Sequence, residues 1–319
     1  MLMAGASASL ALANALERDG YPRPKLSRLQ TRIIDAAGEI GEERQPRQPN
    51  TIDFLHAVLC QVGLPRSRVG GDRFERTSGA ASLLVEAGSL WNSRQWVRQQ
   101  LPYGPKPRLA LIHICSEAVR TQQPRVEVGN SVRDFLLRLG LDTGGREYHR
   151  FRIQMQALAA CRMTVGIGAS TVDAKPIKEF AAWLDSSGGQ RTIWPGEIEL
   201  TADFFGSLIE HAVPIDHRAL GALKHSALAM DVYVWLAHRL WRIRSSGGAR
   251  LSWANLRDQF GQEYQDPKDF KKKFKPALAA AISVYPDARI ETVAGGLLLF
   301  PSPPPIRRTL VAVQKRGED

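Results

Sequence analysis

Residues 266–300 read DPKDFKKKFKPALAAAISVYPDARIETVAGGLLLF. Asp266 is a favoured helix N-cap residue, and Pro267 follows at the first helical position, where its missing N–H costs no hydrogen bond. The apolar spacing that follows predicts a helix over residues 267–284.

The two sides of this helix differ in chemistry when each residue is turned by about 100°. The apolar side contains Phe270, Phe274, Ala277, Leu278 and Ala281. The opposite side contains Lys268, Lys272 and Lys275, flanked by Lys271 and Lys273. A row of ammonium groups suits phosphates spaced along a groove, and the alternative is a solvated, lysine-rich face. Pro276 predicts either a kink or a helix that stops and restarts, because proline removes one backbone hydrogen bond.

Two strands are predicted after this helix, over 289–293 and 297–300, joined at Gly295-Gly296. Double glycine favours a tight hairpin, in which both turn residues take positive φ. Arg289 is the one cation in the hairpin, so we expect Arg307 and Arg308 to supply further positive charge.

Other elements precede the basic helix in the same part of the chain. Thr201 and Asp216 are predicted to begin helices, and a long apolar helix is expected over 225–243. Ser252 is predicted to cap a short helix over 253–260. Helix, turn, longer helix and hairpin is the winged-helix pattern.

A similar order of elements occurs earlier in the chain. Ser131 is expected to cap a short helix, which a turn at 140–145 joins to a longer helix over 146–161. Strands are predicted over 163–167, 175–183 and 191–200. Upstream, we expect a helix over 51–62 and a hairpin that pairs 83–85 with 96–97. The sequence therefore predicts an α+β protein with two tandem winged-helix domains.

The domain organisation follows from these patterns and from prolines that interrupt the first fifty residues. We predict a flexible N-terminal extension over 1–50, a first winged-helix domain over 51–200, a second over 201–305 and a C-terminal tail over 306–319.

The helix over 146–161 is the second candidate for recognition of DNA. Its predicted buried stripe is Tyr148, Phe151, Met155 and Leu158. Its outward side carries Arg146, His149, Arg150 and Ile153, with Arg152 and Gln156 on the flanks. Arginine can contact guanine and glutamine can contact adenine in the major groove, whereas the alternative is an ordinary polar surface.

The composition agrees with a nucleic-acid partner. The chain has 319 residues, 44% of them hydrophobic and 24% charged, which excludes wholesale disorder. Lys and Arg number 43 against 32 Asp and Glu, so the net charge is +11, and a protein this basic is expected to bind a polyanion. Three scattered cysteines exclude a disulfide scaffold and indicate a reducing compartment. With no apolar run of about 18 residues, a cytoplasmic protein without membrane contact is expected.

The sequence lacks the motifs of several enzyme classes. It has no G-x-x-x-x-G-K-[ST] phosphate loop, and its seven histidines show no H-x-H or H-E-x-x-H spacing. We therefore predict no catalytic residues, no metal site and no cofactor, and expect a protein that is not an enzyme.

Several motifs together resemble plasmid-encoded RepA replication initiators. They are LPYGPKPR at 101–108, SEAVR at 116–120, FLLRLG at 135–140, SWANLRDQF at 252–260 and DFKKKF at 269–274, followed by Lys275-Pro276-Ala277. The resemblance covers about residues 52–305.

This resemblance implies an initiator of theta-type replication that binds iterons, which are direct repeats of double-stranded DNA at a plasmid origin, through two winged-helix domains. It also implies melting of adjacent DNA, recruitment of the host initiator and replicative helicase, and a possible homodimer. The family's basic helix matches Lys268, Lys271, Lys272, Lys273 and Lys275. Two alternatives stay open: a transcriptional repressor of winged-helix type, and an initiator-like subunit of a ribonucleoprotein complex that binds RNA.

Overall fold

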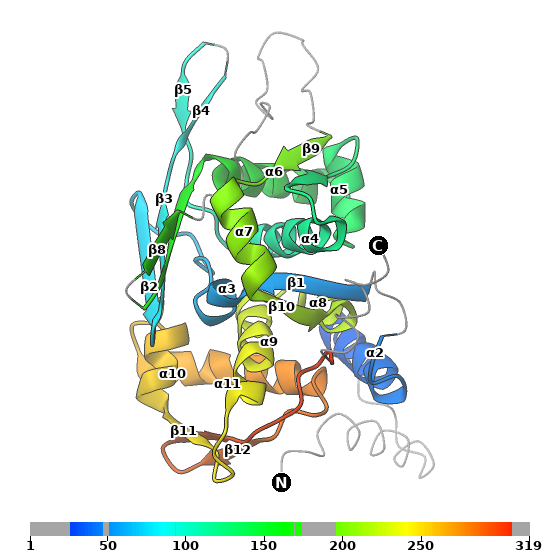
Figure 1. Ribbon diagram of the computed structural model, residues 1–319, viewed down its shortest axis with the longest axis vertical. Helices are drawn as coiled ribbons and strands as arrows, with labels where there is room; N and C mark the ends of the chain where they lie inside the picture. The colour runs from blue at the N-terminus through cyan, green and yellow to red at the C-terminus, as the bar shows by residue number, and fades with distance from the viewer. Residues whose placement is uncertain (1–25, 47–50, 93, 169, 174–195, 308–319) are drawn as a thin grey trace. The chain divides into compact units, whose positions relative to one another are not determined.

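The computed structural model describes residues 26–46, 51–92, 94–168, 170–173 and 196–307 (Figure 1). Helices and sheets are mixed in it, which confirms the predicted α+β class. The chain divides into two compact units, which we describe separately. The middle unit is residues 53–213, and the outer unit combines residues 1–52 with 214–319. Within the described residues, every helix is too short or too polar to cross a membrane.

In the outer unit, the buried helix α9 packs against α11, and three short strands form an antiparallel sheet in the order β11-β13-β12 (Figure 1). Its elements are α2 (Arg28–Glu42), α8 (His217–Leu223), α9 (Ala227–Arg239), the 3-10 turn η2 (Leu240–Arg242), β11 (Ala249–Ser252), α10 (Trp253–Phe260), α11 (Pro267–Ser283), β12 (Ile290–Val293) and β13 (Gly296–Leu299). The order from α9 onward is helix, strand, helix, helix and hairpin.

The predicted starts of α10 and α11 are confirmed. The Ser252 hydroxyl accepts a hydrogen bond from the backbone N of Asn255 at 3.1 Å, and the Asn255 side chain accepts one from the backbone N of Ser252 at 3.2 Å. The Asp266 carboxylate accepts a bond from the backbone N of Lys268 at 2.7 Å. Side chains thus satisfy helix N–H groups that have no partner within the helix.

The hairpin after α11 has the predicted strands but a different turn. Val293 pairs with Gly296, so the turn residues are Ala294 and Gly295, and only Gly295 has positive φ, at 85°. Gly296 lies in β13, where a Cβ atom would overlap the carbonyl oxygen of Leu251 on β11. The second glycine therefore permits close approach of two strands rather than an unusual φ.

A helix lies in the segment for which we expected a flexible extension. The Ser27 hydroxyl and the Gln30 side chain cap the start of α2 reciprocally. Helix α2 packs against α8 and α11, and its residues Ala36 and Ile40 are buried. Charged residues between the apolar positions, and prolines nearby, made this segment look weakly folded in the sequence.

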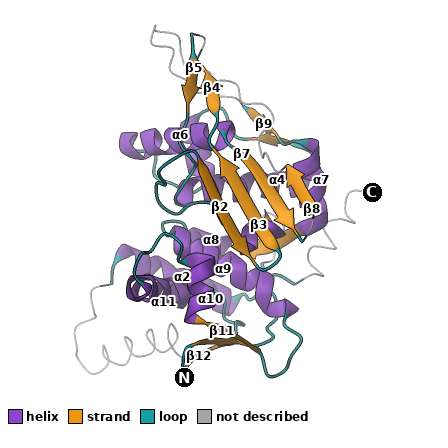
Figure 2. Ribbon diagram, turned by 90° about the vertical axis from the view of Figure 1, so that its left-hand side faces the viewer, coloured by secondary structure: helices purple, strands orange, loops and turns teal. Residues whose placement is uncertain are grey.

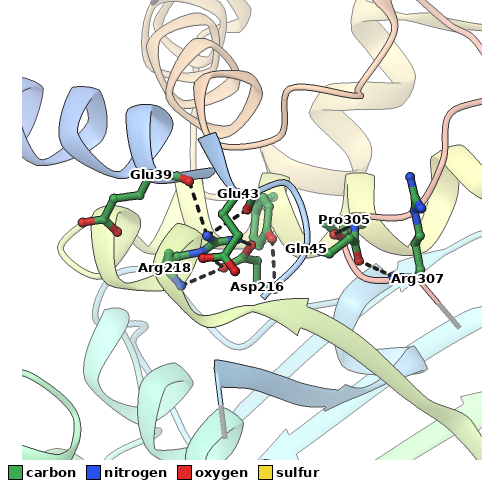
Figure 3. A network of polar contacts seen from close by, with 8 residues as sticks. Glu39, Glu43, Gln45, Asp216, Arg218, Pro305 and Arg307 are labelled. Atoms are coloured by element: carbon green, nitrogen blue, oxygen red, sulfur yellow. Dashed lines mark hydrogen bonds and ion pairs between the residues drawn. The ribbon is translucent and has the colours of Figure 1, made fainter. Parts of the chain in front are cut away.

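Polar contacts fix the end of α2 within the outer unit (Figure 3). The Arg218 guanidinium pairs with the Asp216 carboxylate at 2.7 Å and donates to the Glu43 carbonyl oxygen at 3.0 Å. The Gln45 side chain donates to the Pro305 carbonyl oxygen at 3.2 Å and accepts from the backbone N of Arg307 at 2.9 Å. Described residues from the predicted extension and the predicted tail are thus in contact, while the three predicted domain boundaries stay predictions.

In the middle unit, helices α4, α5 and α6 form one packed group, and a four-stranded antiparallel sheet has the order β2-β3-β7-β8 (Figure 2). Its elements are β1 (Ile52–His56), α3 (Ala57–Gln61), β2 (Arg73–Ser78), β3 (Ala81–Glu86), β4 (Ser89–Trp91), β5 (Trp96–Arg98), α4 (Pro105–Thr121), β6 (Arg125–Glu127), α5 (Val132–Arg138), α6 (Gly145–Ala160), β7 (Arg162–Ile167), β8 (Ser170–Asp173), β9 (Glu197–Glu199), α7 (Ala202–His211) and the start of β10 (Ala212–Asp216). β4 pairs with β5, and β6 pairs with β9.

Two local predictions in this unit were wrong. The helix expected over 51–62 begins only at Ala57, because residues 52–56 form the buried strand β1. The hairpin expected between 83–85 and 96–97 does not form, because β3 pairs with β2 and β7, and β5 pairs with β4. The strand predicted over 175–183 lies outside the described residues.

Candidate nucleic-acid interface

Helix α11 has the two faces that its sequence predicts. Phe270 and Phe274 are fully buried, as is Ala281, and Ala277 and Leu278 are nearly so. The lysines of the opposite side, Lys268, Lys272 and Lys275, are exposed. Burial of the apolar side holds the helix in place, so the ammonium row points into solvent.

Trp253, the first residue of α10, orders two of the five lysines. The Lys271 and Lys275 Nζ atoms lie 5.3 and 5.9 Å from the centroids of its ring system. The Trp253 ring also meets the buried Phe274 ring edge-on at 6.2 Å. A cation over an aromatic face is attracted to it, so Trp253 restricts these two side chains without neutralising their charge. This role was not predicted from the sequence, because Trp253 and the lysines lie on different helices.

Lys273 lies apart from the lysine row. It lines a hollow of about 260 Å³ together with Leu29 and Ile33 of α2 and with Tyr264 and Pro276. Helix α11 continues through Pro276, so of the two alternatives expected there, the stop and restart does not occur. Proline has no N–H to offer the Lys272 carbonyl, which is the one four residues earlier.

Positive charge at the hairpin comes from a strand that we did not consider. Arg250 of β11 is exposed and donates to the carbonyl oxygen of the turn residue Ala294 at 2.6 Å. Arg289 lies over the Phe300 ring, 5.5 Å from its centroid. The backbone of Arg307 is held by Gln45, and Arg308 lies outside the described residues.

The loop between α10 and α11 is fixed by Arg257. Its guanidinium donates to the carbonyl oxygens of Tyr264 at 3.2 Å and Gln265 at 2.9 Å. Because the two helices are joined by this braced loop, their relative orientation is well defined.

Helix α6 of the middle unit agrees with its predicted faces except at one residue. Phe151, Met155 and Leu158 are fully buried, but Tyr148 is 36% exposed. The buried face is centred farther round the helix, where Gln154 is 94% buried and accepts a hydrogen bond from the backbone N of Tyr103 at 2.7 Å. Tyr148 therefore lies at the edge of the stripe rather than within it.

The outward side of α6 is basic with one acidic residue. Arg146, His149 and Arg150 are exposed, and Arg152, Ile153 and Gln156 are half-buried. Glu147 lies 3.5 Å from Arg150 and 2.7 Å from Lys106 of α4. The hydrogen bond from Lys106 lowers the pKa of the Glu147 carboxyl, which keeps it ionised. Glu147 thus bridges a cation of α4 and a predicted recognition residue.

The 101–108 motif has a structural role beside α6. The buried Arg108 guanidinium donates to the carbonyl oxygens of Leu64, Pro65 and Gly104 at 2.5–2.9 Å. Gly104 takes φ of 82°, a conformation that favours glycine. Together with the Tyr103–Gln154 bond, these contacts fix the start of α4 against α6.

A match over a segment that begins at residue 101 identifies the family of the chain. Residues 101–259 match the family described as plasmid encoded RepA protein. The chain belongs to the plasmid-encoded RepA family. The matched segment contains α4, α5 and α6 and ends within α10, so it is narrower than the resemblance over 52–305 and does not reach α11.

Two solved structures are similar to the chain at low sequence identity. A crystal structure of selenomethionine derivatives of domain 2 and domain 3 of RctB has a TM-score of 0.46 and 12% identity, covering 70% of this chain and 82% of that one. A second, of RctB domains 2–3, has a TM-score of 0.43 and 12% identity, with 74% and 85% covered. No curated protein matches the chain.

The three cysteines and His56 are buried. Burial raises the pKa of the Cys115 thiol to about 12, and Cys60 and Cys161 are also buried. Burial lowers the pKa of His56 to about 4, with a further contribution from His211. Among the described residues, no group of three His, Cys, Asp or Glu side chains is placed to hold a metal ion.

Proposed function

We propose that this RepA-family protein initiates plasmid replication by binding repeated double-stranded sites at an origin. The single observation that carries the proposal is α11, on which buried phenylalanines and exposed lysines occupy opposite sides directly before a hairpin. A chain with a net charge of +11 gives this helix a long-range attraction for DNA.

The order α9, β11, α10, α11, β12 and β13 supports a winged helix in the outer unit, with α11 as its recognition helix. In this arrangement Lys268, Lys272 and Lys275 contact phosphates, while Lys271 and Lys275 are positioned by Trp253. Arg250 places a cation at the turn of the wing. Lys273 is the weakest member of the predicted set because it faces the hollow beside α2.

For the middle unit, α4, β6, α5 and α6 in succession support a second winged helix, with β9 pairing β6. Arg146, His149, Arg150, Arg152 and Gln156 are its proposed base and phosphate contacts. Arginine and glutamine are suited to guanine and adenine edges, so α6 supplies sequence choice while α11 supplies much of the affinity.

The protein acts by binding rather than by catalysis in this proposal, and it needs no cofactor. Its partners are the host initiator and replicative helicase, and a homodimer is a further state. These partners are proposed from the family to which the chain belongs.

Footprinting on the DNA that flanks the gene tests the function. Regularly spaced, directly repeated protections are expected for an initiator. One protected palindrome would favour a transcriptional repressor instead, and tighter binding to an RNA than to any duplex would favour a ribonucleoprotein subunit.

A further inference from the structure

The hairpin β4–β5 presents two tryptophans to solvent. Trp91 lies opposite Trp96 in the strand register, with ring centroids 5.6 Å apart. Trp96 is 70% exposed and Trp91 48%, and Trp96 is the most exposed large hydrophobic residue among those described. The hairpin projects beyond the four-stranded sheet of the middle unit (Figures 1 and 2). Exposed aromatic residues paired in this way mark a binding surface rather than a core.

Hydrogen bonds link the two strands of this hairpin near its tip and at its root. At its tip, the Asn92 side-chain oxygen accepts hydrogen bonds from the backbone N atoms of Arg94 at 3.0 Å and Gln95 at 2.8 Å. At its root, the backbone N of Gln99 donates to the Gly88 carbonyl oxygen at 2.9 Å. A Cβ atom on Gly88 would overlap the carbonyl oxygen of Ala160, the last residue of α6. The root of the hairpin therefore lies directly against the end of α6.

The surroundings of the tryptophans are basic. Residues 89–98 contain Arg94 and Arg98 and no acidic residue. Arg98 pairs with Asp72 at 2.8 Å, although more than half of each side chain is exposed. The charge of this strand–turn–strand segment thus favours an anionic ligand.

A hollow of about 740 Å³ extends from the hairpin root to α6. Its lining includes Arg68, Arg98 and Asp72, which pairs with Arg98, together with Ile153 and Gln156 of α6. The hairpin surface is therefore continuous with the outward side of α6, for which we propose DNA contacts.

We propose that the β4–β5 hairpin binds unpaired bases of single-stranded DNA, which stack on Trp96 and Trp91 while Arg94 and Arg68 contact the neighbouring phosphates. An unpaired base has two open faces beside a phosphate, and the hairpin offers aromatic rings beside guanidinium groups. In an intact duplex the base faces are covered by their neighbours, so the tryptophans have no such ligand there. This inference rests on the proposed function, because an initiator acts where a duplex is opened.

The test measures the anisotropy of fluorescein-labelled oligo(dT) of twenty nucleotides, titrated with the full chain, with a mixed-sequence duplex in parallel. Trp96→Ala is expected to weaken oligo(dT) binding about tenfold, the effect typical of one lost stacking contact, and to leave duplex binding within about twofold. Trp96→Phe should bind nearly as wild type, whereas Trp96→Leu should behave as the alanine variant. Leu137→Ala is the matched control, because Leu137 is 59% exposed in the same unit but lies on α5.

Unchanged oligo(dT) binding by both Trp96→Ala and Trp91→Ala would overturn the proposal. Full binding by Trp96→Leu would also overturn it, because an apolar side chain without stacking would then suffice, as at a protein interface. Tighter, Trp96-dependent binding of oligo(rU) would replace DNA with RNA as the ligand. If the alanine variant melts earlier than wild type, the Phe and Leu variants decide the matter. Footprinting at the origin tests the proposed function, and oligo(dT) binding tests this inference. Failure of one therefore gives a different result from failure of the other.

Discussion

Arg150 is the residue through which sequence choice by α6 can be tested. It is exposed, and its nearest charged neighbour is Glu147 at 3.5 Å, a contact that is easily exchanged for a base. Arg150→Ala is expected to relax discrimination at one base pair by about 1–3 kcal/mol. Measured affinities for single-base variants of a protected site report this change.

Arg133→Ala is the control for that experiment, because Arg133 is an exposed arginine of α5 outside the predicted contacts. It should leave the ranking of site variants unchanged. If Arg150→Ala weakened all variants equally, Arg150 would contact a phosphate and not a base.

His56 makes the stability of the middle unit depend on pH. Its Nδ1 accepts a hydrogen bond from the backbone N of Val58 at 3.2 Å, and its Nε2 lies 3.0 Å from the Ser207 hydroxyl. The folded pKa is about 4, lowered from 6.5 by burial and by His211. The unfolded chain therefore binds a proton first as the pH falls, so stability is complete above about pH 6.5 and decreases toward pH 4.

The expected loss from His56 between pH 7 and pH 5 is about 2 kcal/mol. Urea unfolding followed by circular dichroism measures it, and the difference between wild type and His56→Gln separates it from His238, whose pKa is also about 4. Equal pH dependence in the two proteins would show that His56 titrates normally when folded.

At the scale of single elements, the hairpin β12–β13 depends on the absence of one side chain. Gly296→Ala places a methyl group of β13 against the Leu251 carbonyl oxygen of β11, so these two strands must separate. We expect a loss of about 1–3 kcal/mol in the free energy of unfolding. Gly247→Ala is the matched control, because the nearest atom to its Cβ would be the Ser245 hydroxyl oxygen at 3.7 Å. Thermal unfolding of the two variants should differ clearly, and equal midpoints would contradict the strand packing described here.

Elements set by local chemistry were predictable from the sequence, and those set by distant contacts were not. Ser131, Ser252 and Asp266 cap their helices as predicted, since capping uses atoms three residues away at most. The partners of β3 are chosen by sheet pairing with β2 and β7, and β7 lies about eighty residues away, so a short-range hairpin signal was misleading.

The same distinction applies to the candidate site. The lysine row of α11 follows from helical periodicity, which the sequence contains in full. Trp253 and Arg250 contact residues of other elements, so the spacing of residues within one element cannot predict these contacts. Tyr148 was misplaced because Gln154, a polar residue, takes a buried position through its bond to Tyr103.

On the scale of the whole molecule, the outer unit is assembled from both sides of the middle unit in the sequence. Helix α2 packs on α8 and α11, so its removal should destabilise the unit that carries the lysine row. A chain lacking residues 2–46 is expected to unfold at a lower temperature than one lacking residues 2–25, which retains α2 and its cap Ser27. Equal unfolding midpoints for these two chains would show that α2 adds nothing to the stability of the unit.

The salt dependence of DNA binding tests the central claim most directly, namely that the lysine row of α11 contacts phosphates. With a protected origin repeat as ligand, Lys272→Ala should weaken binding to all sequences and reduce the slope of log affinity against log salt by about 0.9. Lys273→Ala, which alters a lysine beside α2 rather than in the row, should change the slope much less. A slope for Lys272→Ala equal to that of wild type would contradict the account.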